Sequence, residues 1–177
     1  MTSALILAAT VVSALTVSAA TPGAMPDWSK AATAQRAVYN EPFVIDGLQA
    51  AISRVSYVSQ YPDGTLPDTG ARAVQVEFWA RNPEKNDITF FDRFYPYAVV
   101  SDGSDTDGEG VSFYPLESNA GIGDLKLAPG MNLHARFVLE IPANTTVTGL
   151  VIYGPTDGAK VTLSPGAFAP VAPMSVP

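Results

Sequence analysis

The chain has 177 residues, of which 47% are hydrophobic and only 15% charged, with 15 prolines, 14 glycines and no cysteine. This length suits one domain with a full hydrophobic core, and the low charge with many turn residues favours short strands over long solvated helices. The net charge of −7 leaves no basic surface for nucleic acid or anionic membrane, and the lack of cysteine excludes disulfides and thiolate metal sites.

The first 20 residues carry no charged side chain and end in small residues. An apolar run from Leu5 to Leu15 precedes Val17-Ser18-Ala19, which fits the small-x-small pattern cut by signal peptidase, although the usual basic residue before the run is missing. We therefore expect residues 1–19 to be a signal peptide, and the protein to be secreted or associated with the cell envelope, without stable membrane insertion after cleavage. The alternative is an uncleaved anchor, but Thr and Ser dilute the run below what a spanning helix needs.

The two ends of the remaining chain lack the patterns of regular structure. Residues 20–40 have many small residues and weak periodicity, which predicts a flexible N-terminal segment with at most a helical turn near 31–37. Residues 164–177 contain four prolines, which exclude helix and interior strand and predict an extended Pro-rich tail. The folded domain is therefore expected within residues 41–163.

Two segments alternate apolar and polar residues with a period of two. In residues 72–82 one face carries Val74, Val76, Phe78 and Ala80, and the other carries Gln75, Glu77, Trp79 and Arg81. In residues 133–141 the inward set is Leu133, Ala135, Phe137, Leu139 and Ile141, and the outward set is His134, Arg136, Val138 and Glu140. Such alternation predicts strands with one buried face.

Five further segments complete the predicted strands. Residues 48–61 form another strand, whose apolar phase shifts between Ile52 and Val55 as a β-bulge would require. Short strands are expected at 94–101, 110–114, 146–153 and 161–163, with turn sequences at 82–87, 101–110, 128–131, 142–145 and 154–158. The chain is therefore predicted to be all-β, an immunoglobulin-like antiparallel β-sandwich of about seven to eight strands.

The order of these features from residue 72 to 153 resembles a known family. The runs are V-x-V-x-F-x-x-R-N-P-E-K-N-D-I-T-F, F-Y-P-Y-A-V-V-S-D-G-S-D, L-K-L-A-P-G-M-N-L-H-A-R-F-V-L-E-I-P and L-V-I-Y. They are similar to the exported bacterial immunoglobulin-like domains of unknown function that are related to the mycobacterial immunoprotective extracellular antigens. The resemblance implies an exported immunoglobulin-like sandwich. Its motifs are turn sequences, so it implies no catalytic residue.

The acidic stretch S-D-G-S-D-T-D-G-E-G, residues 101–110, has two interpretations. No register fits an EF-hand: with Asp102 first, Asp107 falls where glycine is needed and Phe113 falls where the bidentate Glu is needed. We expect a solvated hairpin tip with Asp-Gly turn chemistry. The alternative is a weak calcium site formed by Asp102, Asp105, Asp107 and Glu109; no other cofactor is expected.

The run F-F-D-R-F-Y-P-Y, residues 90–97, holds five aromatic residues, too many for one buried face. If Phe90 and Phe94 point inward, the exposed side chains form a binding surface of Phe91, Tyr95 and Tyr97, with Trp79 nearby. Exposed aromatics are typical of surfaces that bind protein or carbohydrate. The alternative is that they cover a sheet edge or lie beneath the N-terminal segment.

Catalytic motifs are missing from the sequence. His134 is the single histidine, which excludes most hydrolytic triads, and neither G-x-S-x-G, G-x-G-x-x-G nor a P-loop occurs. We expect His134 to be a surface imidazole whose replacement by Ala leaves stability almost unchanged.

The sequence favours a secreted, non-enzymatic module that binds a protein or cell-envelope partner through exposed aromatics. The first alternative is a structural subunit of an extracellular or envelope-associated assembly, docking through its terminal arms. The second is an enzyme that uses carboxylates alone. A concave aromatic patch would favour the binding module, whereas an open edge strand with ordered arms packed away from their own core would favour assembly. Two carboxyl groups facing each other in a cleft would favour an enzyme.

Overall fold

The computed structural model describes residues 24–33, 36–38, 40–106, 110–156 and 158–162, and these are almost entirely strands and turns. The signal peptide and the Pro-rich tail predicted above lie outside these residues. The strands are β1 (Ala32–Thr33), β2 (Arg36–Val38), β3 (Phe43–Ile45), β4 (Leu48–Val58), β5 (Ala71–Arg81), β6 (Ile88–Thr89), β7 (Tyr95–Val100), β8 (Ser112–Pro115), β9 (Lys126–Leu127), β10 (Asn132–Pro142), β11 (Val147–Tyr153) and β12 (Gly158–Thr162). Two short 3-10 helices are η1 (Trp28–Lys30) and η2 (Phe90–Asp92). Within the described residues, no helix has the length and apolarity to cross a membrane.

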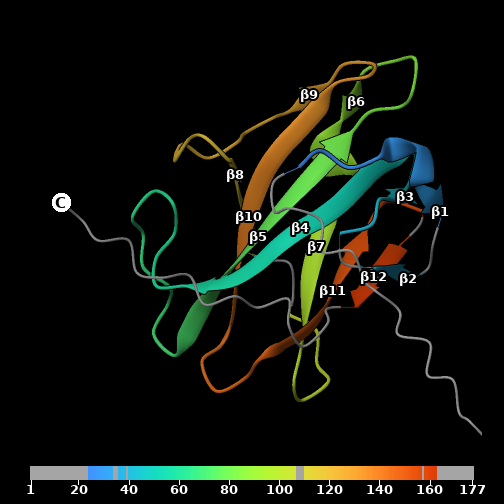
Figure 1. Cartoon of the computed structure of the whole chain (residues 1–177). Coiled ribbons are helices and arrows are strands. Elements are labelled where there is room, and N and C mark those ends of the chain that lie inside the picture. Colours follow the sequence, from blue (N-terminus) through green and yellow to red (C-terminus); the bar gives the residue numbers. More distant parts are fainter. Residues whose placement is uncertain (1–23, 34–35, 39, 107–109, 157, 163–177) are drawn as a thin grey trace, which may run out of the picture.

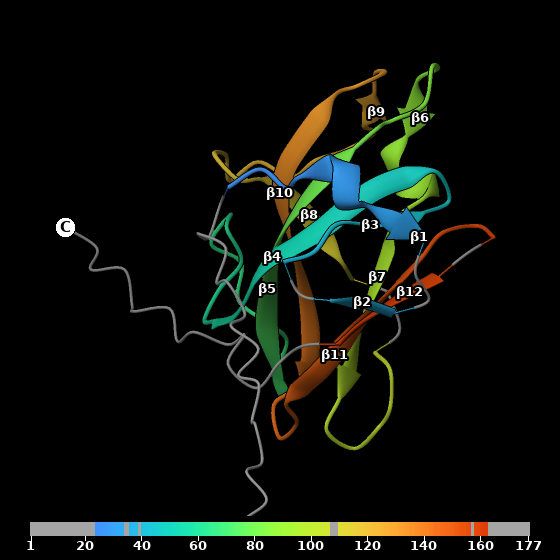
Figure 2. The ribbon, with the colours of Figure 1, turned by 45° about the vertical axis from the view of Figure 1, so that its right-hand side comes forward.

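Two sheets form the sandwich (Figures 1 and 2). The larger sheet has the order β1-β3-β4-β5-β10-β8, the facing sheet has the order β2-β12-β11-β7, and β6 pairs with β9 in a small ribbon. Seven of these strands, taken in chain order, are β4, β5, β7, β8, β10, β11 and β12. The first, second, fifth and fourth lie side by side in the larger sheet, and the third, sixth and seventh lie in the facing sheet, as in immunoglobulin-like sandwiches. The prediction of an all-β sandwich is confirmed. All pairings are antiparallel except β1 with β3 and β2 with β12.

The long strands follow the period-two pattern closely. Val76 and Phe78 of β5 and Phe137 of β10 have no exposed surface, and the inward residues of both strands join one core. β4 contains the predicted bulge, because its pairing with β5 shifts register between Ile52 and Arg54. These strands hold together because each contributes one dry face to the space between the sheets.

Five phenylalanines form the densest part of this core. Phe78 stacks on Phe94 at 5.0 Å and on Phe90 at 5.7 Å between ring centroids. Phe113 meets Phe78 edge to face at 6.2 Å, and Phe137 lies 5.7 Å from both Phe78 and Phe113. The cluster fills the core beneath the edge strands β7 and β8.

Asn82 organises the turn that follows β5. Its buried side-chain amide donates to the carbonyls of Asn86 and Leu127 at 2.8 and 2.7 Å, and its Oδ1 accepts from the Glu84 backbone N–H at 2.8 Å. The side chain therefore satisfies backbone groups that the turn leaves without strand partners.

Two features differ from the sequence expectation. The N-terminal segment, where it is described, contains η1, β1 and β2 instead of a flexible lead-in. Val138 faces outward as predicted but is fully buried, because residues 59–70 fold back over the outer face of the larger sheet. There Val138 packs with Tyr61, Ala73 and Tyr114 in a second, smaller cluster.

Candidate binding cavity between strands β7 and β8

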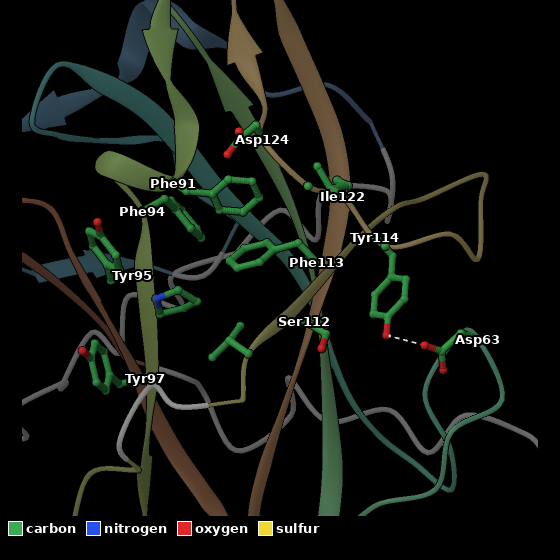
Figure 3. Close-up of a pocket in the computed structure, with 14 residues that line it drawn as sticks. Asp63, Phe91, Phe94, Tyr95, Tyr97, Ser112, Phe113, Tyr114, Ile122 and Asp124 are labelled. Atoms are coloured by element: carbon green, nitrogen blue, oxygen red, sulfur yellow. Dashed lines mark hydrogen bonds between the residues drawn. The ribbon is translucent and has the colours of Figure 1, made fainter.

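A cavity of about 700 Å³ lies where the edge strand of each sheet leaves the sandwich open, between β7 and β8 (Figure 3). Its lining comes from β7, β8, η2, the segment 121–124 and Asp63 of the loop that follows β4. This volume is in the range of small-molecule and side-chain binding sites, which are typically lined by aromatic residues with a few polar groups.

The floor of the cavity is the outer part of the phenylalanine cluster. Phe94 is 1% exposed and Phe113 is 9% exposed, so both belong to the core as well as to the lining. Phe91 is half-buried and meets Phe113 edge to face at 5.1 Å. Because η2 interrupts the strand pattern, Phe90 enters the core while its neighbour Phe91 turns toward the cavity.

Two tyrosines of β7 form one wall. Tyr95 is 45% exposed and Tyr97 is half-buried, and both line the cavity. The Tyr97 ring meets Tyr153 of β11 edge to face at 5.4 Å, and Tyr153 is itself 44% exposed. Tyr153 thus extends the aromatic surface, although its position within L-V-I-Y gave no functional signal.

Asp63 supplies one carboxylate at the rim. Its Oδ2 accepts a hydrogen bond from the Tyr114 hydroxyl at 3.1 Å, although the two residues are 51 positions apart, and its Oδ1 accepts from the Thr65 N–H at 2.9 Å. These hydrogen bonds, first those from Thr65, hold the pKa of Asp63 below its usual range. Asp63 is therefore charged at neutral pH.

The loop that carries Asp63 is fastened to β10. The Tyr61 hydroxyl donates to Glu140 Oε1 at 2.9 Å, and the Asp68 N–H donates to the same carboxylate. Burial, and then the bond to Glu140, raises the pKa of Tyr61. Within the loop, the Tyr61 N–H donates to the Thr65 carbonyl at 2.7 Å. This network fixes the turn at Asp63 beside the cavity.

Asp124 is a second carboxylate at the rim (Figure 3). It lies in the segment between β8 and β9, is exposed, and forms no hydrogen bond or ion pair with another described residue. Its charge is therefore available to a ligand.

The strand edges beside the cavity are poorly suited to pairing with an added strand. The Ala98 N–H points away from β11 and donates to Thr106 Oγ1, so the backbone nitrogen two residues earlier points the same way. That residue is Pro96, which has no N–H to donate. On β8, the Phe113 carbonyl already accepts from Ile122 at 2.7 Å. Side chains, not backbone, are what this site offers.

Trp79 lies elsewhere, so the expectation that it neighbours the other three aromatics is wrong. It is on the outer face of β5, where its ring stacks on His134 of β10 with 3.9 Å between centroids and 8° between planes. His134 is half-buried rather than free in solvent, and neither His134 Nε2 nor Trp79 Nε1 has a hydrogen-bond partner among the described residues. Burial lowers the pKa of His134, against the opposing effect of Glu77 and Glu117.

The acidic stretch after β7 is described up to residue 106. Asp102 accepts from the backbone N–H and the hydroxyl of Ser104 at 2.9 and 2.7 Å, which lowers its pKa. Asp105 forms an antiparallel bridge with Val99 inside β7, so the chain turns back along the edge of this strand. Asp107 and Glu109 lie outside the described residues, and within the described part no group of three acidic or histidine side chains is placed to hold a metal ion. The calcium site therefore stays an untested prediction.

Sequence reasoning identified part of this cavity. Phe91, Tyr95 and Tyr97 were predicted and lie together. Asp63, the lining residues of β8 and residues 121–124 were missed, because only the folding of distant segments brings them there.

Comparison with known proteins gives no family. No protein-family model and no curated protein matches the chain. Among solved structures, the chain is similar to an uncharacterized β-sandwich protein from Clostridium difficile 630, with 14% identity and a TM-score of 0.56 over 75% of this chain and 95% of that one. A conserved hypothetical protein from Bacillus anthracis matches at 15% identity and a TM-score of 0.43, over 70% of this chain and 93% of that one. The clostridial likeness shows the β-sandwich fold alone.

Proposed function

We propose that this protein is a secreted, non-enzymatic module that binds a protein or cell-envelope partner through the cavity between β7 and β8. The observation that carries the proposal is the convergence of Phe91, Tyr95 and Tyr97 on one concave site. A concave aromatic patch is the feature expected of a binding module. Aromatic side chains in such sites supply large contact areas at low conformational cost.

Binding rather than catalysis is also supported by the ionisable groups. Asp63 has a lowered pKa, so it is charged and unsuited to act as a general acid near neutral pH. His134, the side chain best suited to proton transfer, is stacked on Trp79 on the outer face of β5 and β10. It does not line the cavity.

An assembly role through strand addition is less favoured. Pro96 removes the backbone donor that a new strand beside β7 would need. Docking through the N-terminal arm is also less favoured, because its described strands β1 and β2 pair with β3 and β12 of the same chain. The proposal includes two inferences from the sequence: residues 1–19 direct export, and the chain is related to the exported immunoglobulin-like family.

Capture of a partner by matched variants tests the proposal. The purified protein is immobilised and exposed to culture medium and envelope extract of the producing organism, with and without chelator. Tyr95→Ser removes an exposed ring from the cavity, and Met131→Ser removes a 41% exposed apolar side chain outside it. We expect a partner that wild type and Met131→Ser retain and Tyr95→Ser loses. Equal retention by all three proteins, or no partner at all, would contradict the proposal.

A further inference from the structure

We infer that the cavity between β7 and β8 accepts a positively charged side chain, Lys or Arg, presented by a partner protein; this inference rests on the proposed function. The charge of the lining is the first reason. Asp63 and Asp124 stand at the rim, and no described lining residue is Lys, Arg or His. A hollow with negative charge alone attracts cations and repels anions, and the net charge of −7 acts in the same direction.

The aromatic rings of the lining are the second reason. In Figure 3 the rings of Phe91 and Phe113 lie at the centre of the site, with Tyr95 on one side and the two carboxylates on others. Ring faces carry partial negative charge and attract cations. The combination of ring faces and carboxylates suits a cation better than a neutral ligand.

The shape of Lys and Arg side chains matches a site that has an apolar floor and a negatively charged rim. Both residues have an apolar stem and a charged head, and they bury the stem while the head stays near water. Here the apolar floor lies below and the carboxylates Asp63 and Asp124 lie at the exposed rim. Because Pro96 disfavours recognition through an added strand, insertion of a side chain is the mode that the site offers.

Asp63 is held in place before any ligand arrives. The Thr65 N–H and the Tyr114 hydroxyl bind its two oxygens, and Tyr61 fastens the loop to Glu140. A carboxylate that is already fixed loses little freedom on binding, so its attraction to a cation is not offset by ordering of the loop.

The test uses two capped peptides, acetyl-Gly-Leu-Arg-Leu-Gly-amide and the same peptide with citrulline in place of arginine. Citrulline has nearly the shape of arginine and no charge. Binding to the purified full-length protein is followed by NMR titration. We expect the arginine peptide to bind at least about fivefold more tightly, the effect of one exposed charge pair, and to weaken with added salt.

Two variants carry the same change in charge at different places. Asp63→Asn keeps an oxygen that accepts from the Thr65 N–H and places an amide NH2 that can donate to the Tyr114 hydroxyl oxygen, but it removes the charge. We expect it to lose most of the preference for arginine. Glu41→Gln is the control: Glu41 is exposed and precedes β3, which β4, β5 and β10 separate from β8. It should keep the preference in full.

The outcomes separate this inference from the proposed function. If the citrulline peptide binds as tightly as the arginine peptide, the cavity binds ligands without using charge, and the inference fails while the proposed function stands. If Asp63→Asn behaves like Glu41→Gln, or neither peptide binds, the inference also fails. The capture experiment with Tyr95→Ser then decides the proposed function on its own.

Discussion

Replacing Phe137 by Ala tests whether the inward face of β10 holds the two sheets together. Phe137 has no exposed surface, and its ring centroid lies 5.7 Å from Phe78 and Phe113 and 6.2 Å from Phe94. Phe to Ala changes in such cores cost about 3–5 kcal/mol, through lost burial and the cavity that remains. Because three other rings lose a neighbour here, we expect the upper part of that range, about 4–5 kcal/mol.

Urea denaturation followed by circular dichroism measures this loss. For a domain of this length, about 4 kcal/mol corresponds to a melting temperature lower by about 8–16 °C. His134→Ala, on the outer face of the same strand, is the matched control. The sequence predicts almost no effect for it, but the stack on Trp79 raises the expected loss to about 1 kcal/mol. A Phe137→Ala loss below about 1 kcal/mol, or below that of His134→Ala, would refute the assigned facing of β10.

Three further predictions concern turns and pH. Asn82→Ala removes three hydrogen bonds of a buried side chain and should cost about 3 kcal/mol in urea melts; a change within error would show that the turn does not depend on them. Gly47→Ala, at a φ of 79°, places Cβ against the Glu84 carboxylate, which the ion pair with Arg93 holds in position, whereas Gly64→Ala, at a φ of 90°, meets nothing within 4 Å. The first should therefore lower the melting temperature more, and equal losses would rule out the contact. Burial lowers the pKa of His134 in the fold, so protonation favours the unfolded chain, and stability is full above the ordinary value of 6.5 and falls as pH drops below it. His134→Gln should therefore lose less stability than wild type between about pH 7.5 and about pH 5.5, and parallel pH profiles would contradict this.

The long strands could be predicted because each has two unlike faces. Alternation identified β5 and β10, and the phase shift in β4 identified its bulge, because a strand with one buried face has an apolar residue at every second position. The strands β1 and β2 have two and three residues, too few for a periodic signal, and they join the sheets through parallel backbone pairing. Val138 faces outward, and its burial could not be predicted because it depends on where residues 59–70 fold.

The cavity could be predicted only in its local part. Five aromatics in eight positions showed that some must leave the core, and Phe91, Tyr95 and Tyr97 do line one site. The sequence predicted that Trp79 lies on the outward face of β5, as observed, but it could not show that this face is remote from the cavity, because alternation does not say where the strands of the other sheet lie. Nor could it show that Asp63 meets Tyr114, a contact made by loop folding.

The most direct test of the account maps a captured partner onto the protein by backbone amide NMR. We predict that the largest shifts fall on β7, β8 and residues 121–124, around the cavity. Shifts centred on Trp79 and His134 at the outer face of the larger sheet, or on β1 and β3 at its far edge, would contradict the assignment of the cavity as the binding surface.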